Sequence, residues 1–179
     1  MNRSVKKFLL ISLYFLLVLV CVYLFITYVG QRVAVIGCSM EPTLKEEDHL
    51  LVDKLSYRFS EPERYDIVVF PYIYEKNTFY VKRIIGLPGE TVYIDDAGQI
   101  FIDGELLEEG YGKEVIRNPG RAYEPITLKD DEYFVLGDNR NDSSDSRDPN
   151  VGNLKRSKIT GKAFMRIYPF DSMGMIKHH

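Results

Sequence analysis

The sequence predicts a single N-terminal transmembrane helix followed by an all-β domain, mainly antiparallel and irregular or barrel-like. Residues 8–29 contain no charged side chain, so this segment is apolar on every face. After residue 30, short β-branched and aromatic runs alternate with turn residues, which is typical of strands. The chain has 179 residues, a length that fits one domain and its anchor.

The apolar segment at 8–29 is long enough to cross a bilayer, because a helix of that length spans about 33 Å and the hydrocarbon core about 30 Å. A cleavable signal peptide would have a shorter apolar core, and a buried helix would need a larger protein around it. Tyr23 and Tyr28 suit an interfacial belt at its outer end. Three basic residues precede the segment: Arg3, Lys6 and Lys7. The positive-inside rule therefore places residues 1–7 in the cytoplasm and residues 30–179 outside.

Charge and cysteine content exclude two classes of protein. The formal net charge is -3, and removing the three N-terminal cations leaves an external part that is more acidic still. This balance predicts no binding to nucleic acid. One cysteine, Cys21, lies inside the apolar segment and the other, Cys38, lies beyond it, so we expect no disulfide framework.

Eight strands are expected in the external domain, as a small irregular barrel or a pair of sheets. The turn sequences Leu87-Pro88-Gly89 and Asp96-Ala97-Gly98 separate some of them. Residues 107–125 are acidic and contain glycine, and we expect an excursion or small flap there. The strands are Gln31–Ile36, His49–Leu55, Asp66–Pro71, Phe79–Ile85, Thr91–Asp95, Gln99–Asp103, Glu132–Leu136 and Thr160–Tyr168.

The first of three reactive stretches follows the first strand. The strand ends near Gly37, Ser39 comes next, and Pro42 prevents a simple continuation of the ladder. A serine in such a turn can present its hydroxyl beside free backbone N–H groups. Taken alone, the pattern equally describes a serine that bonds to its local backbone.

The second stretch contains Lys82, which interrupts the apolar strand at 79–85. One interpretation is a lysine on the solvent face of a half-buried strand. The other is a lysine desolvated by Tyr80, Val81 and Ile84, with its pKa lowered until the neutral amine can accept a proton. The residue pattern leaves both interpretations open.

The third stretch, residues 137–147, is polar and rich in turn-forming residues. It resembles a calcium loop in its Asp and Asn content, but Arg140 occupies the third position of the EF-hand template and Ser143 the place of the required glycine. Alternating acids and arginines indicate a pinned network rather than an ordinary solvated loop.

Together, in this order and after an anchor, the three stretches resemble the type I signal peptidases in the short form typical of Gram-positive bacteria. The nucleophile box, the lysine box and the third box are all present. They are Gly37-x-Ser39-Met40-x-Pro42-Thr43-Leu44; Tyr80-Val81-Lys82-Arg83 with Gly86-x-Pro88-Gly89; and Gly137-Asp138-Asn139-Arg140 through Ser143 to Asp145-Ser146-Arg147. The resemblance spans the anchor and residues from about 33 to 168.

The resemblance implies a β-rich serine endopeptidase that uses no metal or organic cofactor. Ser39 would be the nucleophile and Lys82 the general base, with Ser143 orienting the lysine amine. Arg83 would face away from Lys82 and pair with Asp138. Asp145 and Arg147 would pin the third loop. Lysine in place of histidine as the base agrees with the few histidines present, since His178 and His179 form a terminal pair and His49 lacks a carboxylate pattern.

The implied substrates are the signal peptides of exported pre-proteins, cut at small-x-small sites on the outer face of a bacterial membrane. The lipid bilayer is the second expected partner, and proximity to the secretion channel is a further expectation. An extended substrate would add as a strand along 79–85 or 31–36. Six residues are expected to contact it, four of them as exposed apolar groups near the lipid interface: Val35, Ile36, Met40 and Leu44, with Tyr80 and Val81.

Two residues beside Ser39 raise separate questions. Cys38 is a rival nucleophile or a small apolar filler. Gly37 stands where some relatives have a serine that adds a hydroxyl to the oxyanion hole, and we expect a serine there to be tolerated. The alternative functions are a catalytically silent membrane-tethered β domain that binds exported segments, and a related Ser-Lys self-cleaving protease.

Overall fold

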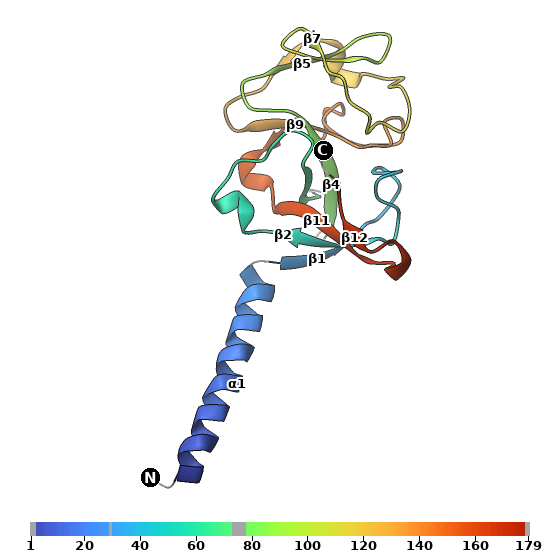
Figure 1. Ribbon diagram of the computed structural model, residues 1–179. Helices are drawn as coiled ribbons and strands as arrows, with labels where there is room; N and C mark the ends of the chain where they lie inside the picture. Colours follow the sequence, from blue (N-terminus) through green and yellow to red (C-terminus); the bar gives the residue numbers. More distant parts are fainter. Residues whose placement is uncertain (1–2, 29, 73–77, 178–179) are drawn as a thin grey trace.

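The computed structural model describes residues 3–28, 30–72 and 78–177 of the chain (Figure 1). The helix α1 (Arg3–Tyr28) stands apart from the β domain and leads towards β1 (Gly30–Ala34). His178, His179 and the side chain of Tyr28 lie outside the described residues.

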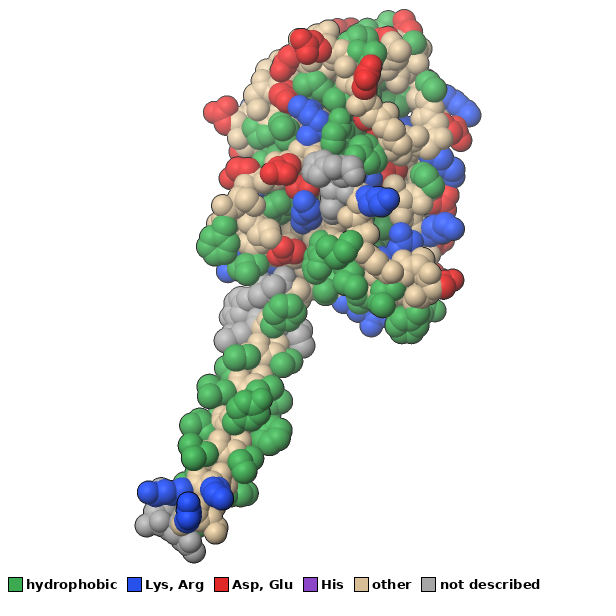
Figure 2. Space-filling model, in the orientation of Figure 1, with side chains coloured by type: hydrophobic (Ala, Val, Ile, Leu, Met, Phe, Trp, Pro, Cys, Tyr) green, Lys and Arg blue, Asp and Glu red, His purple; other side chains and the backbone are tan. Residues whose placement is uncertain are grey.

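α1 is the one helix in the described ranges that is long and apolar enough to cross a membrane, over Arg3–Tyr23. Over this range its side chains are not buried against the β domain. Figure 2 shows hydrophobic side chains along the visible face of the helix and basic side chains at its N-terminal end. From Phe8 onward the helix carries no charged side chain on any face, as a membrane span requires.

The β domain consists of two open antiparallel sheets, so the pair of sheets forms and the closed barrel does not. The larger sheet has the order β1-β2-β11-β3-β4-β9-β10, and β12 pairs with β11. Its strands after β1 are β2 (His49–Asp53), β3 (Ile67–Pro71), β4 (Phe79–Gly86), β9 (Glu132–Leu136), β10 (Leu154–Lys155), β11 (Gly161–Tyr168) and β12 (Gly174–Met175).

The smaller sheet lies at the end of the domain farthest from α1 (Figure 1). Its order is β7-β6-β5-β8. The strands are β5 (Thr91–Ile94), β6 (Ile100–Ile102), β7 (Glu105–Leu106) and β8 (Ile126–Thr127). The excursion expected at 107–125 joins β7 to β8 and buries Ile116 and Ala122 in the core of this sheet, so it is packed down rather than a free flap.

Short 3-10 helices complete the chain: η1 (Ser56–Arg58), η2 (Gly120–Tyr123), η3 (Arg156–Lys158) and η4 (Phe170–Ser172). All eight expected strands are present, each within two residues of its expected bounds. The all-β prediction is therefore confirmed.

The strand β4 is central to the larger sheet and is buried from Val81 to Gly86. β3 pairs along its length from Phe79 to Arg83. On the other edge, β9 pairs only with Arg83–Gly86. Within the described residues, the edge at Phe79–Lys82 therefore has no strand partner and is open to an added strand.

Candidate active site

Ser39 lies in the turn that follows β1, and the third box holds this turn in place. The backbone N–H of Asn139 donates to the carbonyl of Ser39 at 3.0 Å. The Asn139 side-chain amide donates to the carbonyl of Cys38 at 3.2 Å. Two segments about a hundred residues apart in sequence are thus joined directly at the candidate nucleophile.

Lys82 reaches Ser39 from β4. Its Nζ lies 2.6 Å from Ser39 Oγ, and the residue is only 2% exposed. Burial lowers the pKa of Lys82 to about 8, although the carboxylates of Asp145 and Asp138 oppose the shift. The amine is therefore neutral often enough near neutral pH to accept the Ser39 proton.

Arg83, the next residue on β4, is buried with Asp138. Its Nε and Nη2 donate to the two carboxylate oxygens of Asp138 at 2.9 and 2.7 Å, and both side chains are inaccessible to solvent. Thr43 Oγ1 donates to the same carboxylate at 2.5 Å. The Arg83–Asp138 pair implied by the resemblance is therefore present. Through Thr43, Arg83 and Asp138 it connects the turn that carries Ser39, the strand β4 and the third box.

Asp145 and Arg147 form the second buried pair of the third box. Arg147 Nε and Nη2 donate to Asp145 at 2.8 Å each, and Arg147 Nη2 also donates to the carbonyl of Arg140 at 2.5 Å. Asp145 accepts the backbone N–H of Gly137 at 3.1 Å. A Cβ at Gly137 would come within 2.4 Å of the Ser39 carbonyl, so only glycine allows this approach.

Ser143 differs from its expected role. Its Oγ is buried and, among the described residues, has no hydrogen-bond partner, so the bond to the Lys82 amine is absent from this geometry. The cause is the direction of the loop, because successive side chains face opposite ways. Asn141 and Ser143 line one cavity, whereas Asp142 and Ser144 line the groove beside Ser39.

That groove has a volume of about 270 Å³ and contains both Ser39 and Lys82. Five of the six expected substrate-contacting residues line it: Val35, Ile36, Met40, Tyr80 and Val81. Leu44 does not line it. The sequence analysis did not predict that Phe79, Asp142 and Ser144 line the groove. The only signal in the sequence was that each lies next to, or within, one of the three motifs.

The expected exposure of the apolar residues is right for Ile36, which is 73% exposed, and wrong for Val35, Met40 and Leu44, which are buried. The chain turns back after β1 and packs Met40 and Leu44 into the core with Val81. The groove floor is therefore the outer surface of the core.

Cys38 also lines the groove, but its thiol is engaged. Cys38 Sγ donates to Asp142 Oδ2 at 3.0 Å. This hydrogen bond raises the pKa of the Cys38 thiol. Because the thiolate is the reactive form, the contact disfavours Cys38 as the nucleophile.

Gly37 adopts a backbone angle that favours glycine, with φ at +79°. A Cβ would meet no atom within 4 Å, so the obstacle to another residue is strain rather than space. The expectation that serine is tolerated here is therefore corrected, since a left-handed conformation is costly for most other residues.

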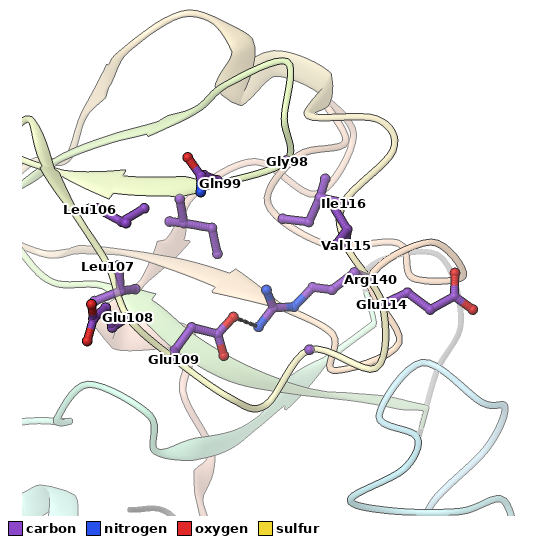
Figure 3. Close-up of a pocket in the computed structure, with 12 residues that line it drawn as sticks. Gly98, Gln99, Leu106, Leu107, Glu108, Glu109, Glu114, Val115, Ile116 and Arg140 are labelled. Atoms are coloured by element: carbon purple, nitrogen blue, oxygen red, sulfur yellow. Dashed lines mark ion pairs between the residues drawn. The ribbon is translucent and has the colours of Figure 1, made fainter.

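A separate cavity lies between the smaller sheet and the third box (Figure 3). Arg140 extends along its base and pairs with Glu109 at 2.5 Å, both side chains being buried. Neither Ser39 nor Lys82 lines this cavity. In the described part of the chain, no group of three or more His, Cys, Asp or Glu residues is placed to hold a metal ion.

The buried Ser-Lys contact on an antiparallel β scaffold defines a class of candidate serine hydrolases, and comparison with known proteins identifies the family. The model for "Signal peptidase, peptidase S26" matches residues 7–168. The chain belongs to this family. The predicted activity as a signal peptidase, a serine endopeptidase, is thereby confirmed at the level of the family.

Individual proteins are similar to this chain. A probable signal peptidase I-2 from Synechocystis is 40% identical over 155 residues, covering 84% of this chain and 68% of that protein. Signal peptidase I of Bacillus amyloliquefaciens is 36% identical over 169 residues, covering 90% and 86%. A crystal structure of a signal peptidase I from Enterococcus faecalis V583 matches with a TM-score of 0.46 and 33% identity, covering 57% of this chain and 97% of that one.

Proposed function

We propose that the protein is a membrane-bound serine endopeptidase that removes signal peptides from exported pre-proteins, with Ser39 as nucleophile and Lys82 as general base. The observation that supports this most strongly is the 2.6 Å contact between Ser39 Oγ and Lys82 Nζ in a buried setting. A serine needs an adjacent base to attack a peptide bond, and a desolvated lysine amine can be that base.

The reaction follows from these two groups. Neutral Lys82 takes the Ser39 proton as Oγ attacks the scissile carbonyl carbon. Among the described residues the backbone N–H of Ser39 has no acceptor, so it is free to donate to the developing oxyanion. The Lys82 ammonium then protonates the leaving amine. Water, deprotonated by the same amine, hydrolyses the acyl-enzyme and regenerates Ser39.

The groove suits an extended substrate beside the open edge of β4. Its side chains would alternate between the two faces of the strand. Val35, Met40 and Val81 are close-packed beneath the groove, which leaves little depth for side chains on that face. We therefore expect small residues at −1 and −3 of the cleavage site.

We propose that residues 8–29 form the single membrane span, with residues 1–7 in the cytoplasm and residues 30–179 outside. The basic side chains at the N-terminal end of α1 support this orientation (Figure 2). Proteinase added to cells stripped of their wall should digest the β domain. Full protection of the domain would contradict the orientation.

Exposed apolar side chains support contact between the domain and the bilayer. Phe170, Met173 and Met175, from η4 to β12, are 78%, 53% and 71% exposed. β12 lies at the end of the domain nearest to α1 (Figure 1). A pre-protein whose apolar signal segment lies in the same bilayer would present its cleavage site at that level, where proximity to the secretion channel would also be expected.

The dyad is tested with a purified full-length enzyme and a pre-protein substrate. Ser39→Ala and Lys82→Ala should each abolish nearly all cleavage, and the double variant should lose little more, because a nucleophile and its base act as a unit. Cys38→Ala is the matched control and should still cleave. If Ser39→Ala cleaves as well as the parent, the dyad is refuted; if the parent cleaves no pre-protein, the domain is a silent binding module.

A further inference from the structure

A second cavity adjoins the catalytic groove, and Tyr80 lines both. Its volume is about 280 Å³. The floor is apolar and two lysines stand among its lining residues. These residues are Phe70, Pro71, Tyr80, Asn150, Val151, Asn153, Leu154, Lys155 and Lys158.

The groove runs along the open edge of β4 and is lined by side chains from both faces of the strand, whereas the second cavity is lined by β4 only at Tyr80. Val81 packs with Val35 and Met40 in one core cluster. Tyr80 packs with Phe70 and Leu154 in another. Successive side chains on a strand point to opposite faces, so Tyr80 and Val81 pack into different core clusters.

A substrate strand beside β4 would alternate in the same way. If the residues at −1 and −3 lie over Val35, Met40 and Val81, the residue between them points to the face of Tyr80. We propose that the cavity beyond Tyr80 binds the side chain at −2 of the substrate and selects a long side chain with an acidic end. This inference rests on the proposed function and adds a preference to the small-x-small rule.

The lining explains both parts of the preference. Phe70, Leu154 and Val151 offer apolar contact to the stem of a long side chain. Lys155 and Lys158 are exposed, and within the described part of the chain neither forms an ion pair. An acidic end would give these ammonium groups a partner, whereas a basic end would be repelled.

The test uses the full-length enzyme in lipid vesicles and a pre-protein with Ala at −1 and −3. Only the −2 residue changes, among Glu, Gln and Lys. We expect kcat/KM to fall in that order, by about threefold to fivefold from Glu to Lys, the size that solvent-exposed ion pairs reach. A parent enzyme that prefers Lys, or shows no order, would overturn the proposal.

Charge reversal makes the test specific. The variant Lys155→Glu/Lys158→Glu should prefer Lys over Glu at −2. The control Lys45→Glu/Lys177→Glu has the same change in net charge at exposed lysines outside the groove and the cavity, and should keep the order of the parent. If both double variants shift the preference equally, the effect is one of net charge and the cavity is not the site.

Two controls distinguish a change in specificity at −2 from a loss of folding or of cleavage activity. Thermal unfolding shows whether the reversal variant is folded; if it is not, Lys155→Gln and Lys158→Gln replace it, and each should narrow the difference between Glu and Lys. Loss of cleavage for every −2 residue in the parent would refute the proposed function itself. Efficient cleavage with no change of order in the variants would refute only the −2 site.

Discussion

Lys82 and Arg83 are neighbours on β4 and are both buried. Of these two residues, Arg83 forms an ion pair with a carboxylate and Lys82 forms none within the described part of the chain. The Arg83 guanidinium lies on Asp138, while the Lys82 amine lies against the uncharged Ser39 hydroxyl. Burial penalises a charge that has no direct counter-ion. The alternation of one strand thus separates a structural cation from an amine that readily gives up its proton.

The pH dependence of cleavage should follow Lys82. Because desolvation lowers its pKa to about 8, the neutral base becomes more abundant as pH rises and is half-formed near pH 8. We expect kcat/KM to rise between pH 6 and 8 and level off above about 9. Lys82→Arg, which stays charged, should be inactive throughout this range. Activity that falls from pH 6 to 8 in the parent would contradict a lysine base.

Breaking the buried Arg83–Asp138 pair should destabilise the domain strongly. Asp138→Asn leaves the Arg83 guanidinium buried without its counter-ion, at a cost of about 3–5 kcal/mol in the free energy of unfolding. Glu114→Gln is the control, because the Arg117–Glu114 pair is exposed and such pairs contribute less than about 1 kcal/mol. Urea unfolding measures both variants, and equal losses would show that burial does not govern the effect.

The longer strands were predictable because each contains a run of β-branched and aromatic residues several positions long, bounded by turn residues. β9 matches its expected bounds, Glu132–Leu136, without an error. The strands that were missed, β7, β8, β10 and β12, have two residues each. Two residues are too few to form such a run, and these strands are defined only by their pairing with a longer neighbour.

The identity of the candidate catalytic residues was predictable, because they belong to ordered sequence motifs. The burial and orientation of the residues around them were not, because these depend on tertiary packing. The boxes predicted that Ser39 and Lys82 belong together. The burial of Met40 and Leu44 depends on how the chain turns back after β1, which no local pattern encodes. The same holds for Ser143, which the course of the loop turns towards the neighbouring cavity rather than the groove.

Replacing Gly37 should cost stability through backbone strain. With φ at +79° and open space around it, Gly37→Ser is expected to lose about 1–2 kcal/mol in the free energy of unfolding. Gly37→Asn should lose less, because asparagine tolerates this region better. Unfolding curves and kcat are measured together. A serine variant as stable as the parent, with higher kcat, would instead show an added oxyanion donor.

Contact between the β domain and the bilayer can be measured with a single introduced tryptophan, because the chain contains none. Met175→Trp places the indole on β12, at the end of the domain that faces α1, and Leu106→Trp places it on β7, at the far end (Figure 1). Both positions are exposed, at 71% and 48%. In vesicles with brominated lipids, emission from the β12 indole should be blue-shifted and quenched, since tryptophan favours the membrane interface. The β7 indole should remain unquenched and red-shifted. Equal quenching of the two, or none at β12, would show that the domain does not rest on the membrane by this edge.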